Sequence, residues 1–169
     1  NIYFLLFLFF FFFLPLNFAN LSKIIQLLKI KPLIALILVF IFIFYMTTFR
    51  ADHFWNSSIF NFFLRNRILN YVLSNDLLKA LFFLPIGYSL LSIYTTKLVR
   101  RSYYLIYIFT IIFLSLSWLI EIRYYFIPLT LFIAFKRENS NIVEYSTIFI
   151  YIITTTIIFI GTIKQVFFL

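Results

Sequence analysis

Residues 102–135 decide the fold, and they read SYYLIYIFTIIFLSLSWLIEIRYYFIPLTLFIAF. Within this run only Glu121 and Arg123 are charged. A charged side chain inside a bilayer is costly unless it has a partner or reaches water. We therefore predict two membrane spans, at residues 103–120 and 124–135, with a break and a functional site at the charged residues between them.

The composition of the whole chain is that of an integral membrane protein. Of its 169 residues, 64% are hydrophobic and 11% are charged, whereas a soluble domain carries about 25% charged residues. The phenylalanine-rich run at 7–13 is predicted to contact lipid. Hydrophobic stretches near the roughly 20 residues that cross a bilayer recur along the chain. They predict an all-α, polytopic protein with about six transmembrane helices, at residues 2–18, 32–48, 77–95, 103–120, 124–135 and 142–163.

The basic residues between these spans predict the orientation of the chain. The connections 19–31, 96–102 and 136–141 hold eight of the fourteen bases, and they share one side if all six spans cross. Basic connections are typical of the cytoplasmic side. Attraction to anionic headgroups explains the formal charge of +9 without a nucleic-acid partner. The opposite side receives the connection 49–76, the charged break and the C-terminus.

An amphipathic helix lying in the membrane interface is predicted within the connection 49–76. Apolar residues recur there every three or four positions, from residue 59 to residue 72, with polar and basic residues between them. Arg65 and Arg67 on the polar side are predicted to contact lipid headgroups or an acceptor. Ser74-Asn75-Asp76 is expected to end this helix and to cap the next one.

A polar and aromatic cluster just beyond the second predicted span is one half of a candidate site. Arg50 and His53 are residue types that neutralise a phosphate, and the Asp52 carboxylate is of a type that takes a proton from a hydroxyl. We expect Asp52 and His53 to line a sugar or acceptor pocket, and Trp55 to stack on a sugar. The same residues also fit a solvated interface loop with an aromatic belt residue.

The charged break supplies the other half of the candidate site. Residues two apart do not share a helix face, so Glu121 and Arg123 can serve different partners. We expect Arg123 to hold a phosphate, Glu121 to orient it, and Tyr124 and Tyr125 to stack on a sugar or hold a lipid. A structural ion pair at the headgroup level is the alternative. No cofactor is expected, and the absence of cysteine and the single histidine exclude cysteine-based and multi-histidine metal sites.

The stretch WLIEIRYYFIPL at residues 118–129 resembles the E-x-R-Y-[FY]-x-x-P segment of a known enzyme family. That family is the dolichyl-phosphate-glucose α-1,2-glucosyltransferases, in the GT-C class of membrane glycosyltransferases. Residues 51–55 and 65–67 stand where it has an Asp- and His-containing segment and a basic element. The resemblance covers about residues 45–169 and lacks the acidic first external loop of GT-C enzymes.

The resemblance implies transfer of a hexose, for example glucose, on the non-cytoplasmic side. The donor would be a polyprenyl-phosphate sugar and the acceptor a lipid-linked saccharide or another glycan. Arg50 and Arg123 would bind the donor phosphate, and the catalytic base is unassigned. The missing loop and the absence of an initiator methionine predict that residues 1–169 are one transmembrane domain, the C-terminal part of a longer protein. Its membrane would be the bacterial inner membrane or the endoplasmic reticulum.

Two other functions fit the same sequence. A non-enzymatic subunit of a larger bacterial or organellar membrane complex, in the latter case in an organellar inner membrane, would explain the phenylalanine-rich composition. In that case Glu121 and Arg123 would pair with neighbouring chains. A transporter fits less well, because the spans hold few polar residues. The enzyme requires Arg50, Asp52, Glu121 and Arg123 to converge at one membrane face, and the subunit does not.

Overall fold

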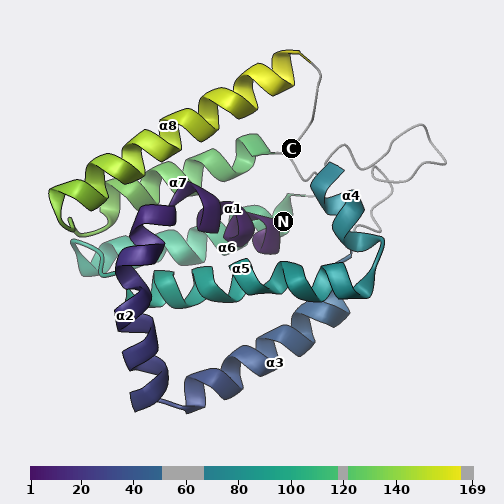
Figure 1. Ribbon diagram of the computed structural model, residues 1–169, viewed down its shortest axis with the longest axis horizontal. Coiled ribbons are helices and arrows are strands. Elements are labelled where there is room, and N and C mark those ends of the chain that lie inside the picture. The colour runs from purple at the N-terminus through teal and green to yellow at the C-terminus, as the bar shows by residue number, and fades with distance from the viewer. Residues whose placement is uncertain (51–66, 118–121, 165–169) are drawn as a thin grey trace.

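The computed structural model is built of helices joined by short links (Figure 1). It describes residues 1–50, 67–117 and 122–164, and of residues 67, 122, 123 and 162 it describes the backbone alone. Within these residues there is no strand, apart from an isolated bridge between Leu98 and Lys136, so the all-α prediction is confirmed. The helices are α1 (Ile2–Phe12), α2 (Leu14–Ile30), α3 (Leu33–Thr48), α4 (Arg67–Leu73), α5 (Asp76–Thr95), the 3₁₀ turn η3 (Arg101–Tyr104), α6 (Leu105–Leu116), α7 (Ile122–Phe135) and α8 (Asn141–Ile163).

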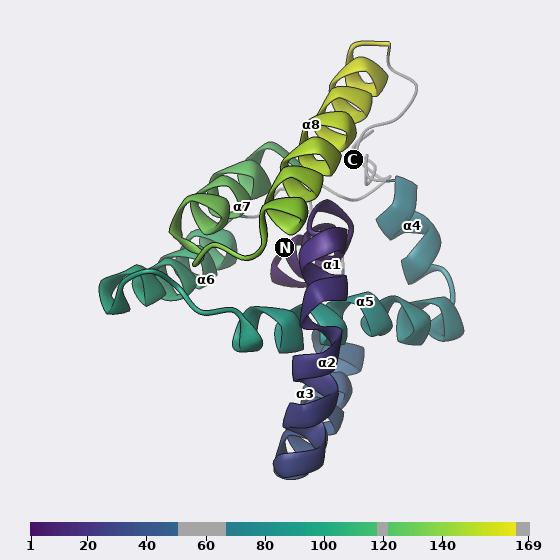
Figure 2. The same ribbon diagram turned by 60° about the vertical axis from the view of Figure 1, so that its left-hand side comes forward.

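Helix α5 is the central element. It contacts α1, α2, α3 and α4. Figure 1 shows α5, α6, α7 and α8 running lengthwise, while α2 leaves the bundle and α3 returns beneath α5. Figures 1 and 2 both show α2 crossing the direction of α5 rather than following it. The links that follow α5 and α7 lie at one end of the bundle, and the residues that follow α3 and α6 start at the other (Figure 1).

A sharp bend divides the first hydrophobic stretch. Helices α1 and α2 differ in direction by 96° across Phe13. Pro15 lies in the first turn of α2, where its missing N–H removes no helix bond. The Asn17 side chain donates to the Phe10 carbonyl at 2.9 Å, and so satisfies one of the carbonyls that the end of α1 leaves free. The prediction that residues 19–31 form a connection is wrong, because α2 continues through them.

Aromatic side chains of α1 form the interior of the bundle. Phe9, Phe12 and Phe13 are buried, and the ring of Phe9 lies 4.9 Å from that of Phe132 on α7. The prediction that the run 7–13 contacts lipid is therefore wrong for these three residues, although Phe11 is exposed. Edge-to-face ring pairs add to the packing of such a core.

The described helices follow several predicted spans closely but differ in length. Helices α5 and α8 are long and apolar enough to cross a bilayer, and the bent α1–α2 pair makes a third if it is counted as one span. The other apolar helices, Leu33–Thr48, Arg101–Leu116 and Tyr124–Phe135, are shorter. Helices below about 17 residues cross a full hydrocarbon core only where the bilayer thins.

The second described part of the connection 49–76, residues 67–76, contains the short helix α4. Leu69 and Val72 are buried in the core, and α4 packs against α5. The preceding part of the predicted amphipathic helix, residues 59–66, lies outside the described residues. Asn75 caps α5, because its side chain accepts a hydrogen bond from the Leu77 N–H at 2.7 Å. The predicted cap of this helix is thereby confirmed.

Candidate functional site

The structure describes part of the site that the sequence predicts. Arg50 is exposed just after α3, and Tyr124 and Tyr125 lie in the first turn of α7. Asp52, His53, Trp55, Arg65 and Glu121 lie outside the described residues, as do the side chains of Arg67 and Arg123. The roles assigned to all of these residues stay predictions.

The first turn of α1 joins the two flanks of the predicted site. On one flank, the Asn1 side chain donates to the Ser117 carbonyl, and the Tyr125 hydroxyl donates to Asn1 Oδ1 at 2.6 Å. On the other flank, the Tyr3 hydroxyl lies 2.8 Å from the Thr48 hydroxyl, and its ring packs edge-on against Phe49 at 5.6 Å. The same helical turn therefore contacts Phe49, near the end of one described segment, and Ser117, the last residue of another.

The two tyrosines of the motif differ in their surroundings. Tyr125 is 0% exposed, and its ring lies edge-on to Phe4 at 5.5 Å. Tyr124 is half-buried, with its ring 6.1 Å from Phe113. These neighbours give Tyr125 a packing role between α1 and α7, and they leave part of Tyr124 accessible. Ligand contact by either tyrosine stays a prediction.

Lys79 is a charged residue that the sequence analysis missed. It is 8% exposed, and its ammonium donates to the Met46 carbonyl at 2.7 Å and lies 5.9 Å from the centre of the Phe49 ring. The buried Tyr45 hydroxyl donates to the Lys79 carbonyl at 2.9 Å. Lys79 thus brings a buried positive charge to the end of α3, against Met46 and Phe49. Its signal in the sequence was a lysine one turn inside a predicted span, where a base needs a partner.

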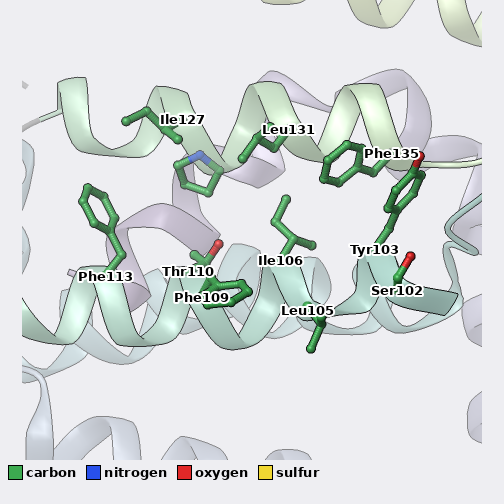
Figure 3. Close-up of a pocket in the computed structure, with 11 residues that line it drawn as sticks. Ser102, Tyr103, Leu105, Ile106, Phe109, Thr110, Phe113, Ile127, Leu131 and Phe135 are labelled. Carbon is green, nitrogen blue, oxygen red and sulfur yellow. The ribbon is translucent and has the colours of Figure 1, made fainter. Parts of the chain in front are cut away.

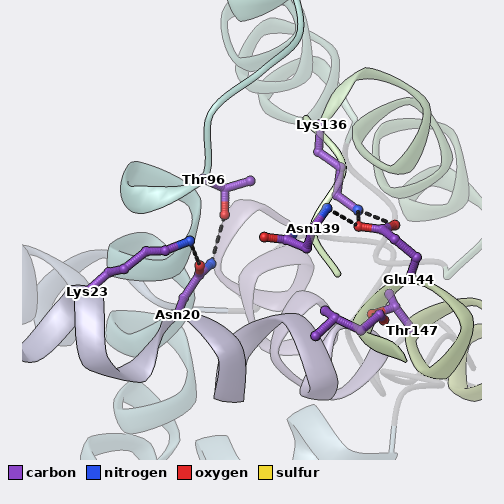
Figure 4. Close-up of polar contacts among 8 residues, drawn as sticks. Asn20, Lys23, Thr96, Lys136, Asn139, Glu144 and Thr147 are labelled. Carbon is purple, nitrogen blue, oxygen red and sulfur yellow. Dashed lines mark hydrogen bonds and ion pairs between the residues drawn. The ribbon is translucent and has the colours of Figure 1, made fainter. Parts of the chain in front are cut away.

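A second polar region lies at the opposite end of the bundle (Figure 4). Asn20 on α2 is 1% exposed and donates to the Thr96 hydroxyl at 2.9 Å, while Lys23 donates to Asn20 Oδ1 at 3.2 Å. Lys136 is 4% exposed and bonds both carboxylate oxygens of Glu144 on α8. Both buried groups are therefore held by polar partners, as burial of such groups requires.

A polar pocket of about 350 Å³ opens in this second region. It lies between α2, the link after α5 and the link after α7. The two links are joined by backbone bonds from Arg137 N–H to the Lys97 carbonyl at 2.8 Å and from Val99 N–H to the Phe135 carbonyl at 2.9 Å. The lining residues include Asn20, Lys23, Thr96, Lys97, Arg137 and Glu138. The sequence analysis expected these three basic segments on one side, and the structure brings one base from each into one pocket.

An apolar groove of about 320 Å³ runs between α6 and α7. Figure 3 shows Ile106 and Phe113 of α6 pointing toward α7, and Leu131 of α7 pointing toward α6. Ser102 and Tyr103 lie at one end of the groove, beside the link after α5. The lining is hydrocarbon and aromatic, so the groove suits an apolar chain rather than a charged ligand.

Metal ligands do not gather in the described part of the chain. No group of three or more histidine, aspartate or glutamate side chains there is placed to hold a metal ion. Acidic side chains are few in the whole sequence, with five Asp and Glu residues. In the described part of both polar regions lysine and arginine outnumber the acids, and these bases bind anions.

Comparison with known proteins adds no relative. No family model, no curated protein and no solved structure matches this chain. The resemblance to the glucosyltransferases therefore rests on the quoted motifs alone.

Proposed function

We propose that this chain is an integral membrane protein, with the α1–α2 pair and α3, α5, α6, α7 and α8 all within the bilayer. Large apolar side chains on its outer helices support this placement. Phe40 on α3 is 71% exposed and Phe149 on α8 is 64% exposed, and other apolar residues of both helices are exposed beside them. Soluble monomers rarely expose large contiguous apolar patches, whereas lipid covers them without cost.

The orientation of this placement is testable by cysteine labelling, because the chain has no native cysteine. Ser74 lies at the end of the bundle that carries the predicted site, and Ser140 lies beside the pocket at the opposite end. Both serines are exposed, so each is replaced by cysteine. We expect a membrane-impermeant maleimide, added to sealed inside-out vesicles, to label Ser140→Cys and to spare Ser74→Cys. Labelling of both residues from one side would contradict the placement.

We further propose that the chain is the C-terminal region of a glycosyltransferase that uses a polyprenyl-phosphate sugar. The observation that carries this proposal is a set of contacts made by the first turn of α1, which we call the α1 junction. There Asn1 bonds Ser117 and Tyr125, while Tyr3 contacts Thr48 and Phe49. The described residues next to both halves of the predicted site are thus in contact with one helical turn. The buried cation of Lys79 adds positive charge there, which favours an anionic donor.

The proposed chemistry is transfer of a hexose, such as glucose, to a hydroxyl of a lipid-linked or glycan acceptor. The acceptor oxygen attacks the anomeric carbon, the bond from that carbon to the phosphate oxygen breaks, and polyprenyl phosphate leaves with the bonding electrons. Arg50 and Arg123 stabilise the negative charge that develops on the phosphate. Glu121 orients Arg123, Asp52 and His53 line the sugar or acceptor pocket, and Trp55 and Tyr124 stack on the sugar. The base that takes the hydroxyl proton is unassigned.

Replacing Arg123 by alanine tests this function. The full-length protein is assayed in membranes with dolichyl-phosphate-glucose as the sugar donor. We expect the rate of transfer to fall by about 100-fold or more, because removing a hydrogen-bonding group that stabilises developing negative charge has an effect of this size. The matched control is Arg101→Ala, which removes the same charge at the opposite end of the bundle.

The two arginine variants are compared at equal amounts of inserted protein. Insertion is measured by resistance to alkaline extraction, which the Arg123 variant should retain. Normal transfer by Arg123→Ala, or equal losses in the two variants, would remove Arg123 from the proposed site.

The exposed face of α8 favours one alternative, a non-enzymatic subunit of a membrane complex. Ile142, Phe149 and Phe159 are among its exposed apolar residues, and a neighbouring chain would cover them as well as lipid does. Under this alternative Glu121 and Arg123 pair with that neighbour. Cross-linking from α8 to a different polypeptide, together with no transfer activity in the wild-type protein, would favour the subunit over the enzyme.

A further inference from the structure

The pocket between α2 and the two links lies outside the proposed transfer site, and its charges fit an anion. Lys23, Lys97 and Arg137 line it, against Glu138 as the one carboxylate among the described lining residues. The nearby Glu144 carboxylate is engaged by Lys136, so it does not neutralise these three bases. The pocket therefore carries an excess of positive charge.

Contacts between distant segments bring the bases of this pocket together, and a hydrogen bond fixes the Lys23 side chain. The Arg137 N–H bond to the Lys97 carbonyl, at 2.8 Å, fixes the backbones of two of them side by side. The ammonium of Lys23 is held by Asn20 Oδ1, and Asn20 is anchored to Ser92 on α5 and to Thr96 directly after it. Groups that are held before a ligand arrives bind it at a lower entropic cost.

We propose that this pocket binds the phosphate of an anionic phospholipid headgroup. A volume of about 350 Å³ admits such a group. Ile142, in the first turn of α8, is 79% exposed and follows the lining residue Asn139 by three positions. It offers hydrocarbon surface for a lipid tail, which favours a lipid over a free phosphate. Basic pockets at the cytoplasmic ends of membrane helices bind headgroups in this way.

The inference goes beyond the transfer function and shares no residue with its site. It rests on the proposed membrane placement, which the cysteine labelling tests separately. A negative result with Arg123→Ala therefore leaves the lipid pocket standing. Conversely, a negative result in the lipid-binding experiment leaves the proposal of sugar transfer standing.

Lipid binding is measured by native mass spectrometry of the detergent-purified protein, with phosphatidylglycerol and phosphatidylcholine offered in equal amounts. We expect selective binding of phosphatidylglycerol. The double variant Lys97→Ala/Arg137→Ala should weaken it about 25-fold, at about fivefold for each base removed. The control Lys29→Ala/Lys31→Ala removes the same charge from the far end of α2 and should change binding less than twofold.

A variant that is expected to bind the lipid more tightly excludes misfolding as the cause of weaker binding. Glu138→Gln removes the carboxylate from the pocket and should tighten phosphatidylglycerol binding about fivefold, which a damaged fold cannot do. Equal losses in the two double variants, or unchanged binding in both, would overturn the proposal. Binding of inorganic phosphate with no selectivity for phosphatidylglycerol would also overturn it, by assigning the pocket to a soluble anion.

Discussion

Replacing Glu144 by alanine is expected to destabilise the fold by about 3 kcal/mol, the lower end of the cost of leaving one partner of a buried ion pair alone, because the Glu144 side chain is 22% exposed. Lys136 is 4% exposed, and both oxygens of Glu144 hold its ammonium. The carboxylate also accepts the Asn139 N–H at 2.8 Å. The variant thus strands a buried cation and a backbone donor together. The free energy of unfolding, measured by denaturant titration in detergent, gives the cost.

Two controls separate the ion pair from a general effect of charge. Glu138→Ala removes an exposed acid from the same link and should change stability by no more than about 0.5 kcal/mol. The double variant Lys136→Met/Glu144→Leu removes both charges and should recover much of the loss, since apolar residues of similar volume often replace buried pairs well. Equal losses for Glu144→Ala and Glu138→Ala would show that Lys136 does not depend on Glu144.

Four of the six predicted spans match the helices α3, α5, α7 and α8 within two residues at each end, because hydrophobic runs bounded by prolines and charged residues mark them. The predicted range 32–48 became Leu33–Thr48, and 142–163 became Asn141–Ile163. Helix α2 was missed because Lys23 and Lys29 looked like a polar connection. Its contacts are tertiary: Asn20 reaches Ser92 on α5 and Thr96 directly after it, 72 and 76 residues away in sequence. No local pattern contains such a contact.

The candidate site was predicted only in part, for the same reason. Their isolation in an apolar run marked Glu121 and Arg123 in the sequence, whereas no role was predicted for Lys79. Its burial depends on the end of α3, where it satisfies the Met46 carbonyl. The pocket of Lys23, Lys97 and Arg137 likewise required the backbone bonds between two links. The count of basic residues predicted that these bases lie on one side of the membrane, but it could not predict that they line one pocket.

Replacing Tyr125 by alanine is expected to cost about 3 kcal/mol of stability, while Tyr125→Phe costs about 1 kcal/mol. The ring is fully buried against Phe4, so alanine leaves a cavity between α1 and α7. In lipid, packing contributes more than water exclusion, which places the loss at the lower end of the range for buried aromatics. Phenylalanine keeps the ring and loses the bond to Asn1. Denaturant titration of the two variants measures both costs.

The pair of tyrosine variants also decides what Tyr125 does in the proposed enzyme. If it acts by packing, sugar transfer should fall with stability, strongly for alanine and little for phenylalanine. Tyr124→Phe is the matched control, since that ring is half-buried and is the one expected to meet the sugar. Loss of transfer in Tyr125→Phe, with stability and the Tyr124→Phe activity preserved, would mean that the Tyr125 hydroxyl leaves Asn1 and contacts the substrate. The α1 junction would then open during the reaction, rather than hold the two halves of the site in place.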